Sequence, residues 1–261
     1  MWKFILPLLL LLPACSSLPV PGSAPVTGDS ATARRLLVRS SAASGDPWEK
    51  LRKVDVAYAG KWSGIAAKIQ PVLVDAMFRK SSAETYLPGS RRVRQVHTGP
   101  GGTKQVLRTP GSIEVRYGGV RNTDPDVNDA AAMVADAYTI FLFGPSYLKT
   151  RATGLGMVGS RKIGGEICDG IQGTLRPGIG RSGVDRFIVW IGRDSSQMRQ
   201  FQFSIDCFTP TRGADVEVTF SEHWKAVDGT IWPRHFVERI VRPIPVQAHD
   251  WRMVSLVSKR N

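Results

Sequence analysis

A glycine-rich stretch is the first candidate for chemistry in this 261-residue chain. Residues 154–159 have the sequence Gly-Leu-Gly-Met-Val-Gly, which matches the G-x-G-x-x-G pattern of dinucleotide-binding sites. Such a site requires a strand before the glycines and a helix after them, because the helix N-terminus binds the pyrophosphate. Here the glycines follow the end of a helical pattern, and residues 160–166 show no helical pattern. We therefore predict a glycine-rich turn before a strand.

Ser146 and Lys149 have the Ser-x-x-Lys spacing of the nucleophile in penicillin-recognising enzymes. Those enzymes complete the site with a Ser-Asp-Asn motif and a Lys-Thr-Gly motif. In this sequence Lys149-Thr150 is followed by Arg151, and Ser-Asp-Asn does not occur. We therefore expect no catalysis by this pair.

Acidic residues and histidines are the candidate metal ligands in this sequence. Asp124, Asp126 and Asn128 alternate as at the start of a calcium loop, but that loop needs Gly where Asp129 stands and Glu where Ala135 stands. The histidines lie far apart, without metal-ligand spacing: His97, His223, His235 and His249. The sequence therefore predicts a protein that is not an enzyme, with no catalytic residue, no metal ligand and no cofactor. An exported hydrolase with carboxylates from distant positions stays open as an alternative.

One long helical pattern, residues 124–148, is the element around which the rest is organised. Asp124 is expected to cap this helix, Pro125 to be its first residue, and Gly144-Pro145 to end it. Apolar or small residues recur at the i, i+3, i+4, i+7 spacing of one face: Val127, Ala130, Ala131, Val134, Ala137, Tyr138, Phe141 and Leu142.

Two-residue periodicity, the pattern of strands, dominates the chain on both sides of this helix. It covers residues 54–117, including 72–79, and resumes from residue 187 to residue 257. Two short helices are expected earlier, at residues 31–41 and from Asp46 on. The sequence thus predicts one mainly β (α+β) domain over residues 30–261. We expect a single unclosed antiparallel β-barrel of about ten or eleven strands, with a helical lid or plug.

A wide curled sheet with a single helix against it is thinly filled, so we expect an apolar cavity between the two. A fully packed core without a cavity is the alternative. The residues expected to bind a ligand are apolar and face inward: Val134, Tyr138, Phe141 and Leu142 on the helix, and Phe201, Phe203, Val218, Phe220 and Trp224 on the strands.

Cys168 and Cys207 determine whether the domain has a disulfide. An exported protein favours a bridge. If residues 164–175, 186–193 and 197–207 form a meander, however, the two cysteines lie two strands apart, about 9.6 Å at the usual strand spacing. That separation exceeds the reach of a disulfide, so two free thiols are expected.

The N-terminus has the features of an export signal. Lys3 is followed by an apolar run through Leu12 and by small residues before Cys15. We therefore expect residues 1–14 to be removed as a signal peptide. Residues 15–29, rich in Ser, Pro and Gly, are expected to form a flexible tether.

The segment from Leu12 to Cys15 resembles the lipobox of bacterial lipoproteins, although Pro13 departs from the usual residue. The resemblance implies that Cys15 carries acyl chains such as palmitate and anchors the protein to a membrane. Ser16 resembles the residue that directs such proteins to the outer membrane. We expect a lipid-anchored protein of the bacterial cell envelope, on the periplasmic face.

The formal charge of +13, or +12 after loss of Lys3, is compatible with nucleic acid, anionic lipid or acidic glycan as a partner. Export argues against nucleic acid. As an alternative, the basic residues are simply solvated on the outer faces of the strands.

Three features of the order of elements resemble the LolA/LolB-type periplasmic lipoprotein carrier and receptor family. They are the early helix at residues 31–41, the first strand ending Gly60-Lys61-Trp62, and the late segment 227–236, VDGTIWPRHF. The resemblance implies an unclosed β-barrel with a helical lid over an apolar cavity that holds acyl chains. It implies binding of a lipid or lipoprotein, and a role in trafficking to the outer membrane. The alternative is a non-catalytic structural or accessory outer-membrane lipoprotein whose basic surface contacts anionic envelope components.

Overall fold

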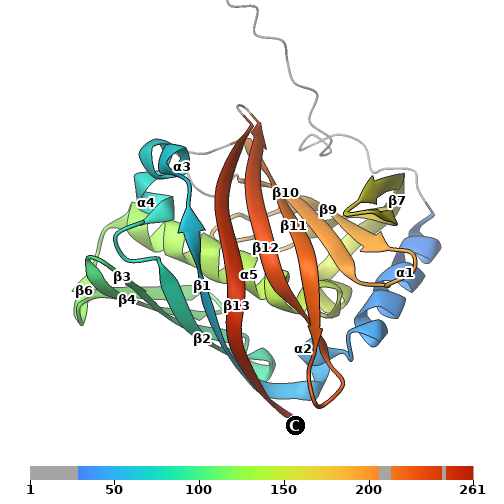
Figure 1. The fold of residues 1–261 in the computed structure, drawn as a ribbon, viewed down its shortest axis with the longest axis horizontal. Helices are drawn as coiled ribbons and strands as arrows, with labels where there is room; N and C mark the ends of the chain where they lie inside the picture. Colours follow the sequence, from blue (N-terminus) through green and yellow to red (C-terminus); the bar gives the residue numbers. More distant parts are fainter. Residues whose placement is uncertain (1–28, 206–212, 243–244, 261) are drawn as a thin grey trace, which may run out of the picture.

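A thirteen-stranded antiparallel sheet curls around one long helix in the computed structural model, which describes residues 29–205, 213–242 and 245–260 (Figure 1). In chain order the strands are β1 (Leu51–Trp62), β2 (Ser81–Leu87), β3 (Arg92–Gly99), β4 (Gly102–Thr109), β5 (Ser112–Tyr117), β6 (Val120–Asn122), β7 (Ala152–Ile163), β8 (Glu166–Leu175), β9 (Asp185–Gly192), β10 (Met198–Ile205), β11 (Ala214–Lys225), β12 (Ile231–Arg242) and β13 (Val246–Arg260). The helices are α1 (Ser30–Ala43), α2 (Pro47–Lys50), α3 (Gly64–Ile69), α4 (Pro71–Val74) and α5 (Pro125–Arg151), with a 3₁₀ turn, η1 (Pro88–Ser90).

The strand order is β6-β5-β4-β3-β2-β1-β13-β12-β11-β10-β9-β8-β7. Strands β1 to β6 form one meander and strands β7 to β13 form another, and the two join where β1 pairs with β13. The unclosed antiparallel sheet predicted from the sequence is therefore confirmed, and both of its edges, β6 and β7, stay unpaired with each other.

The sheet has more strands than predicted, for two local reasons. β6 has only three residues, too few to show a period in the sequence. Residues 154–159, predicted as a turn, lie inside β7, where the strand register shifts twice against β8. Glycines there permit an irregular strand, because β-bulges need backbone conformations that other residues avoid.

Residues 72–79 are not the strand that their alternating pattern predicted. Pro71 is the first residue of α4, and Asp75 ends it in the left-handed conformation, with φ 47°. The preceding helix, α3, was not predicted; the Ser63 side chain caps it by accepting the Ala66 N–H at 3.1 Å. Capping residues decided these local structures, and the apolar alternation did not.

Helix α5 runs from edge strand β6 to edge strand β7 and so crosses the whole concave face of the sheet (Figure 1). Asp124 caps it as predicted, accepting the Asp126 N–H at 2.9 Å. The predicted stop at Gly144-Pro145 is instead a break: Gly144 has φ 45° and ψ −124°, after which the helix resumes to Arg151. Pro145 is tolerated because the first residues of a resumed helix need no N–H partner.

The two early helices were predicted correctly in position. α1 buries Ala33, Leu36 and Leu37, and α2 begins with Pro47 as expected. None of the described helices is long and apolar enough to span a membrane.

Of the three cysteines, Cys168 alone lies among the described residues. Cys168 is a buried, free cysteine on β8, and β8, β9 and β10 do form the predicted meander. Cys207 lies outside the described residues, as do Cys15, the predicted signal peptide and all of the predicted tether except Asp29.

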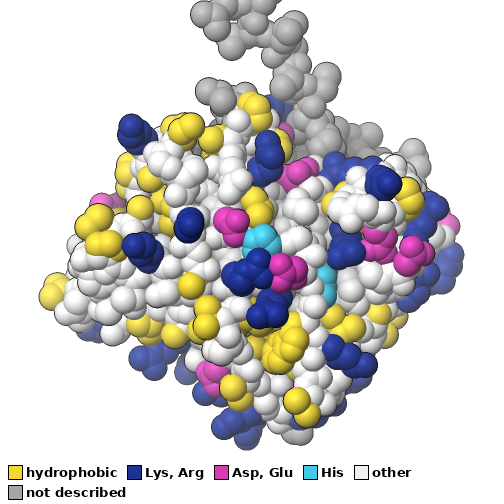
Figure 2. Space-filling model, viewed as in Figure 1, with side chains coloured by type: hydrophobic (Ala, Val, Ile, Leu, Met, Phe, Trp, Pro, Cys, Tyr) yellow, Lys and Arg dark blue, Asp and Glu magenta, His cyan; other side chains and the backbone are white. Residues whose placement is uncertain are grey.

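Basic residues do not gather into one patch on the convex face of β11–β13. Figure 2 shows dark blue side chains scattered there among acidic, apolar and uncharged ones. Arg252 on this face pairs with Glu222, and His235 bonds to Asp250 at 2.7 Å. This face therefore fits the alternative in which basic residues are individually solvated or paired.

Candidate functional site

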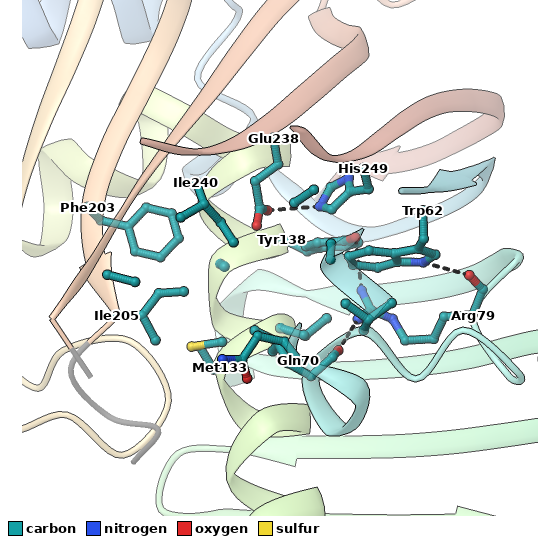
Figure 3. A pocket seen from close by; sticks show the side chains of 17 residues that line it. Trp62, Gln70, Arg79, Met133, Tyr138, Phe203, Ile205, Glu238, Ile240 and His249 are labelled. Atoms are coloured by element: carbon teal, nitrogen blue, oxygen red, sulfur yellow. Dashed lines mark hydrogen bonds and ion pairs between the residues drawn. The ribbon is translucent and has the colours of Figure 1, made fainter. Parts of the chain in front are cut away.

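An apolar cavity lies between the concave sheet face, α5, and the two short helices α3 and α4 (Figure 3). Its apolar lining comes from three directions: Met133, Val134 and Ala137 on α5; Phe203, Ile205, Ala214, Ile240 and Ala248 on β10–β13; and Ala66, Leu73 and Val74 on α3 and α4. A cavity is therefore present in the position that the sequence predicts, between the long helix and the sheet.

The volume of this cavity is small, about 40 Å³ counted as space for the centre of a water molecule. One water needs about 10–15 Å³ by this measure, so roughly three would fit. An acyl chain does not fit in this closed form, and a ligand of that size must displace part of the wall.

One end of the cavity is polar, because the Arg79 guanidinium lies there. Arg79 is 1% exposed; it donates from Nη1 to the Leu73 carbonyl on α4 at 2.7 Å and from Nη2 to the Tyr138 hydroxyl on α5 at 3.0 Å. Its guanidinium carbon also lies 4.6 Å from the centre of the Trp62 ring. A single buried cation thus connects the cover, the central helix and the first strand.

A second polar pair lies beside Arg79 at this end (Figure 3). His249, 1% exposed, shares a 2.8 Å hydrogen bond between its Nε2 and the Glu238 carboxylate, and its ring packs edge-on against Trp62 at 4.5 Å. Among the described residues, Arg79 Nε and His249 Nδ1 have no hydrogen-bond partner. The polar end of the cavity therefore contains two buried nitrogen atoms without a hydrogen-bond partner, beside its apolar walls.

The cover formed by α3 and α4 is thin. Its own buried cluster consists of the small side chains Ala66, Val74 and Ala248. Its outer surface exposes Ile65 (58%) and Ile69 (51%) to solvent. Segments with few buried apolar contacts open at low free-energy cost, so this cover is the part of the cavity wall that can move.

The residues predicted to bind a ligand fall into three groups. Val134, Tyr138 and Phe203 line the cavity. Phe141, Phe201, Val218 and Phe220 are fully buried in the core beneath it, and Leu142 is buried in the same core. Trp224 does not line the cavity: it lies near the end of β11, beyond the register shifts around Glu222, and is 37% exposed.

The polar end of the cavity was not predicted. Arg79 lay in a stretch assigned to a strand, and Glu238 and His249 were seen only as members of alternating strands. The available signal was local: Ser63 and Pro71 mark two helix starts, which place the following Arg79 in a connection beneath a cover rather than in a sheet.

The two side chains of the Ser-x-x-Lys motif bind neighbouring residues of the protein. The Ser146 hydroxyl accepts the Trp48 N–H at 3.0 Å, and Lys149 pairs with Asp46 at 2.7 Å and with Glu49 at 2.6 Å. These contacts hold α2 against α5. In the described part of the chain, no three His, Cys, Asp or Glu side chains are grouped so that they could hold a metal ion.

No family model matches the sequence, and no curated protein does either. Solved structures with a similar fold include a DUF1329 family protein from Desulfovibrio piger, at 14% identity and a TM-score of 0.47, covering 89% of this chain and 94% of that one. A LolA superfamily protein from Nitrosomonas europaea matches at 11% identity and a TM-score of 0.47, over 85% of this chain and 94% of that one. The lipoprotein LppX from Mycobacterium tuberculosis matches at 16% identity and a TM-score of 0.29, over 66% and 89%.

Proposed function

We propose that this protein is a carrier or receptor that holds an acyl chain of a lipid or lipoprotein between α5 and the sheet, without catalysing a reaction. The observation that carries the proposal is the apolar cavity closed by a thin, movable cover. Burial of apolar ligand surface there is worth about 25 cal/mol per Å², which is the driving force for retention.

Entry of the chain requires the α3–α4 cover to move away from α5. The Arg79 bonds to Leu73 and Tyr138 resist this movement, because together they connect α4 to α5 through one side chain. Once the cover opens, the inner faces of Met133, Val134 and Ala137 become available to a ligand. Arg79 therefore sets the balance between the closed and open forms in this proposal.

Two neighbouring residues on β12 test the cavity. Ile240 lines it, whereas Val241 is similarly half-buried and does not. Ile240→Asp places a charge where the acyl chain is to lie, and Val241→Asp introduces the same charge outside the cavity. We expect Ile240→Asp to lower the uptake of a fluorescent fatty-acyl probe by the chain from residue 29 on, and Val241→Asp to leave uptake near the wild-type level.

The same protein should show a bound lipid in native mass spectrometry after purification. A defined adduct that exchanges with phospholipid or with a lipopeptide supports the proposal and identifies the ligand class. An adduct-free mass, together with no uptake of the acyl probe, contradicts it. That outcome favours the structural or accessory lipoprotein, for which the small closed volume of about 40 Å³ is the specific support.

The position of the protein in the cell is part of the proposal. We infer an envelope lipoprotein attached to the outer membrane through acyl chains on Cys15, because the segment before it resembles a lipobox. Cys15→Ser should release the protein from the membrane fraction and abolish incorporation of labelled palmitate. Unchanged membrane attachment in this variant would contradict the anchor.

A further inference from the structure

A second cavity lies on the opposite face of α5. Asp136, Thr139, Tyr147 and Arg151 on α5 line it, whereas Val134 and Ala137 line the first cavity. The β4–β5 hairpin forms one wall and residues 177–178, between β8 and β9, form the other. Its volume is about 250 Å³ by the measure that gives about 40 Å³ for the first. This cavity is thus already open to a small ligand.

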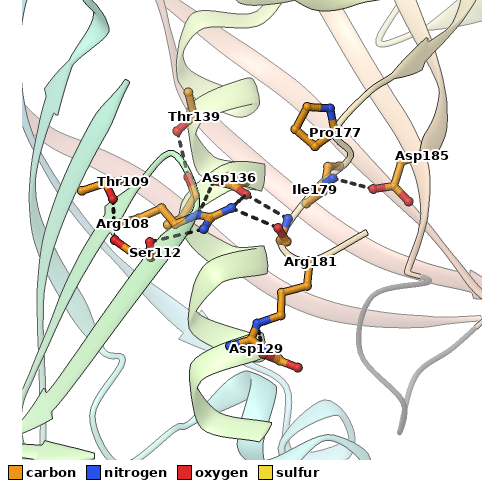
Figure 4. A network of polar contacts seen from close by, with 12 residues as sticks. Arg108, Thr109, Ser112, Asp129, Asp136, Thr139, Pro177, Ile179, Arg181 and Asp185 are labelled. Atoms are coloured by element: carbon orange, nitrogen blue, oxygen red, sulfur yellow. Dashed lines mark hydrogen bonds and ion pairs between the residues drawn. The ribbon is translucent and has the colours of Figure 1, made fainter. Parts of the chain in front are cut away.

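An ion pair and its hydrogen bonds connect the two walls (Figure 4). Arg108 on β4 binds Asp136 through two bonds, Nε at 3.1 Å and Nη2 at 2.8 Å, and donates to the Gly180 carbonyl at 3.0 Å. The Gly180 N–H in turn donates to Asp136 at 2.9 Å. The carboxylate of Asp136 is therefore already occupied by its own protein partners.

Two further guanidinium groups line this cavity without a carboxylate partner. Arg91, exposed at the end of η1, and Arg151, half-buried at the end of α5, form no ion pair with any described residue. Arg151 donates from Nη2 to the Pro177 carbonyl over a long 3.4 Å and interacts with the Tyr147 hydroxyl and with the charge of Asp136. Its buried Nε has no hydrogen-bond partner within the described segments. Both guanidinium groups line the same cavity as Tyr147.

The charge of the lining residues sets the charge of the ligand. Arg91, Arg108 and Arg151 face one carboxylate, Asp136, which leaves two positive charges uncompensated. A phosphomonoester carries about −1.5 to −2 at neutral pH and offers three acceptor oxygens. Guanidinium groups from separate elements suit these oxygens because each can present a planar fork from its own direction.

The rest of the cavity suits the body that carries the phosphate. Trp48 and Tyr147 pack edge-to-face with ring centres 4.8 Å apart and form one wall. Val93, Pro110 and Pro177 add apolar surface. We propose that this second cavity is a binding site for a phosphomonoester on a compact headgroup, separate from the acyl cavity.

The test is calorimetric titration of the full chain with two soluble probes. Glycerol 3-phosphate represents a free phosphomonoester, and dihexanoyl phosphatidic acid represents a lipid one. Dihexanoyl phosphatidylglycerol, a phosphodiester, is the control ligand. We expect either or both monoesters to bind more tightly than the diester. Binding of glycerol 3-phosphate indicates a soluble source, and binding of phosphatidic acid alone indicates a lipid headgroup.

Matched variants separate the site from general basicity. Arg151→Gln should weaken monoester binding by about tenfold or more, since it removes one charge-assisted contact. Arg92→Gln removes the same charge from an exposed residue of β3 that does not line the cavity, and should leave binding unchanged. Arg91→Gln, at an exposed position, gives the same test if Arg151→Gln fails to fold.

Three results would overturn the proposal: no monoester binding at millimolar concentration, equal losses in Arg151→Gln and Arg92→Gln, or diester binding as tight as monoester binding. Uptake of the acyl probe should stay unchanged in Arg151→Gln, because the two cavities lie on opposite faces of α5. The failure of one proposal therefore leaves the other testable.

Discussion

The two halves of the concave face bury very different side chains against the same helix. On the C-terminal half, the Phe141 ring of α5 packs against four rings from three strands, β10 to β12, with centres 5.5 to 6.5 Å away: Phe201, Phe203, Phe220 and Phe236. On the N-terminal half, β2–β4 bury apolar residues such as Tyr86 and Val106 together with four polar ones, each at most 3% exposed: Glu84, Gln95, His97 and Lys104.

This difference explains where the movable cover is located. Aromatic rings fill space densely and need no polar partners, so the C-terminal half forms a rigid wall. In the N-terminal half, His97 Nδ1 has no hydrogen-bond partner in the described residues, and such groups lower stability when buried. Arg79, which binds the α3–α4 cover to α5, comes directly before β2, the first of these strands with buried polar residues.

The largest loss of stability is expected from removing the aromatic ring at the centre of the C-terminal half. Phe141→Ala removes the ring that contacts all three strands and leaves a cavity, which should lower the free energy of unfolding by about 3–5 kcal/mol. Leu107→Ala, at a residue 39% exposed on β4, is the control and should cost much less. Urea denaturation measures both. Equal losses would show that Phe141 is not the centre of the core.

A smaller effect is expected from the tie between the cover and the helix. Arg79→Leu leaves the Leu73 carbonyl and the Tyr138 hydroxyl without their donor, a loss of about 1–3 kcal/mol. Hydrogen exchange should accelerate in residues 64–74 and stay slow in β10–β12, and the acyl probe should enter faster. Arg94→Leu, at an exposed position on β3, is the matched control. Uniform acceleration across the sheet would argue against a separately moving cover.

The stability of the protein should also depend on pH, through the buried His97 of the N-terminal half. Burial lowers the pKa of His97 well below its usual 6.5, helped by the nearby charges of Arg79 and Lys104. The unfolded chain takes up a proton near pH 6.5 whereas the folded protein does not. Stability should therefore fall as the pH drops below about 6.5.

His97→Gln should reduce this dependence, because glutamine has no such proton to gain. Urea denaturation of the wild type and the variant at pH 7 and pH 5 measures the two slopes. An unchanged slope in His97→Gln would mean that another group causes the acid sensitivity.

The sequence was most informative where a pattern is long. The helix from Asp124 carries a repeated apolar face and a cap, so it could be predicted with its N-terminal boundary. The alternating strands on both sides of it gave the unclosed antiparallel sheet. Short elements escaped: β6 has three residues and α4 has four, and neither is long enough to establish a period.

The cavity residues show the same limit. Val134, Tyr138 and Phe203 were identified because inward-facing apolar residues are visible in a periodic pattern. Trp224 does not line the cavity; it lies beyond two register shifts in β11, and the sequence does not reveal such shifts.

The sequence by itself determined the long helix, the two groups of strands and the apolar character of the interior, since these depend on contacts between near neighbours along the chain. Only the tertiary structure decided that Arg79 meets Leu73 and Tyr138, and that Arg91, Arg108 and Arg151 line one cavity. Those groupings depend on how far the sheet curls and where its edges approach. That curvature follows from the twist summed over all thirteen strands, a property that no local segment carries.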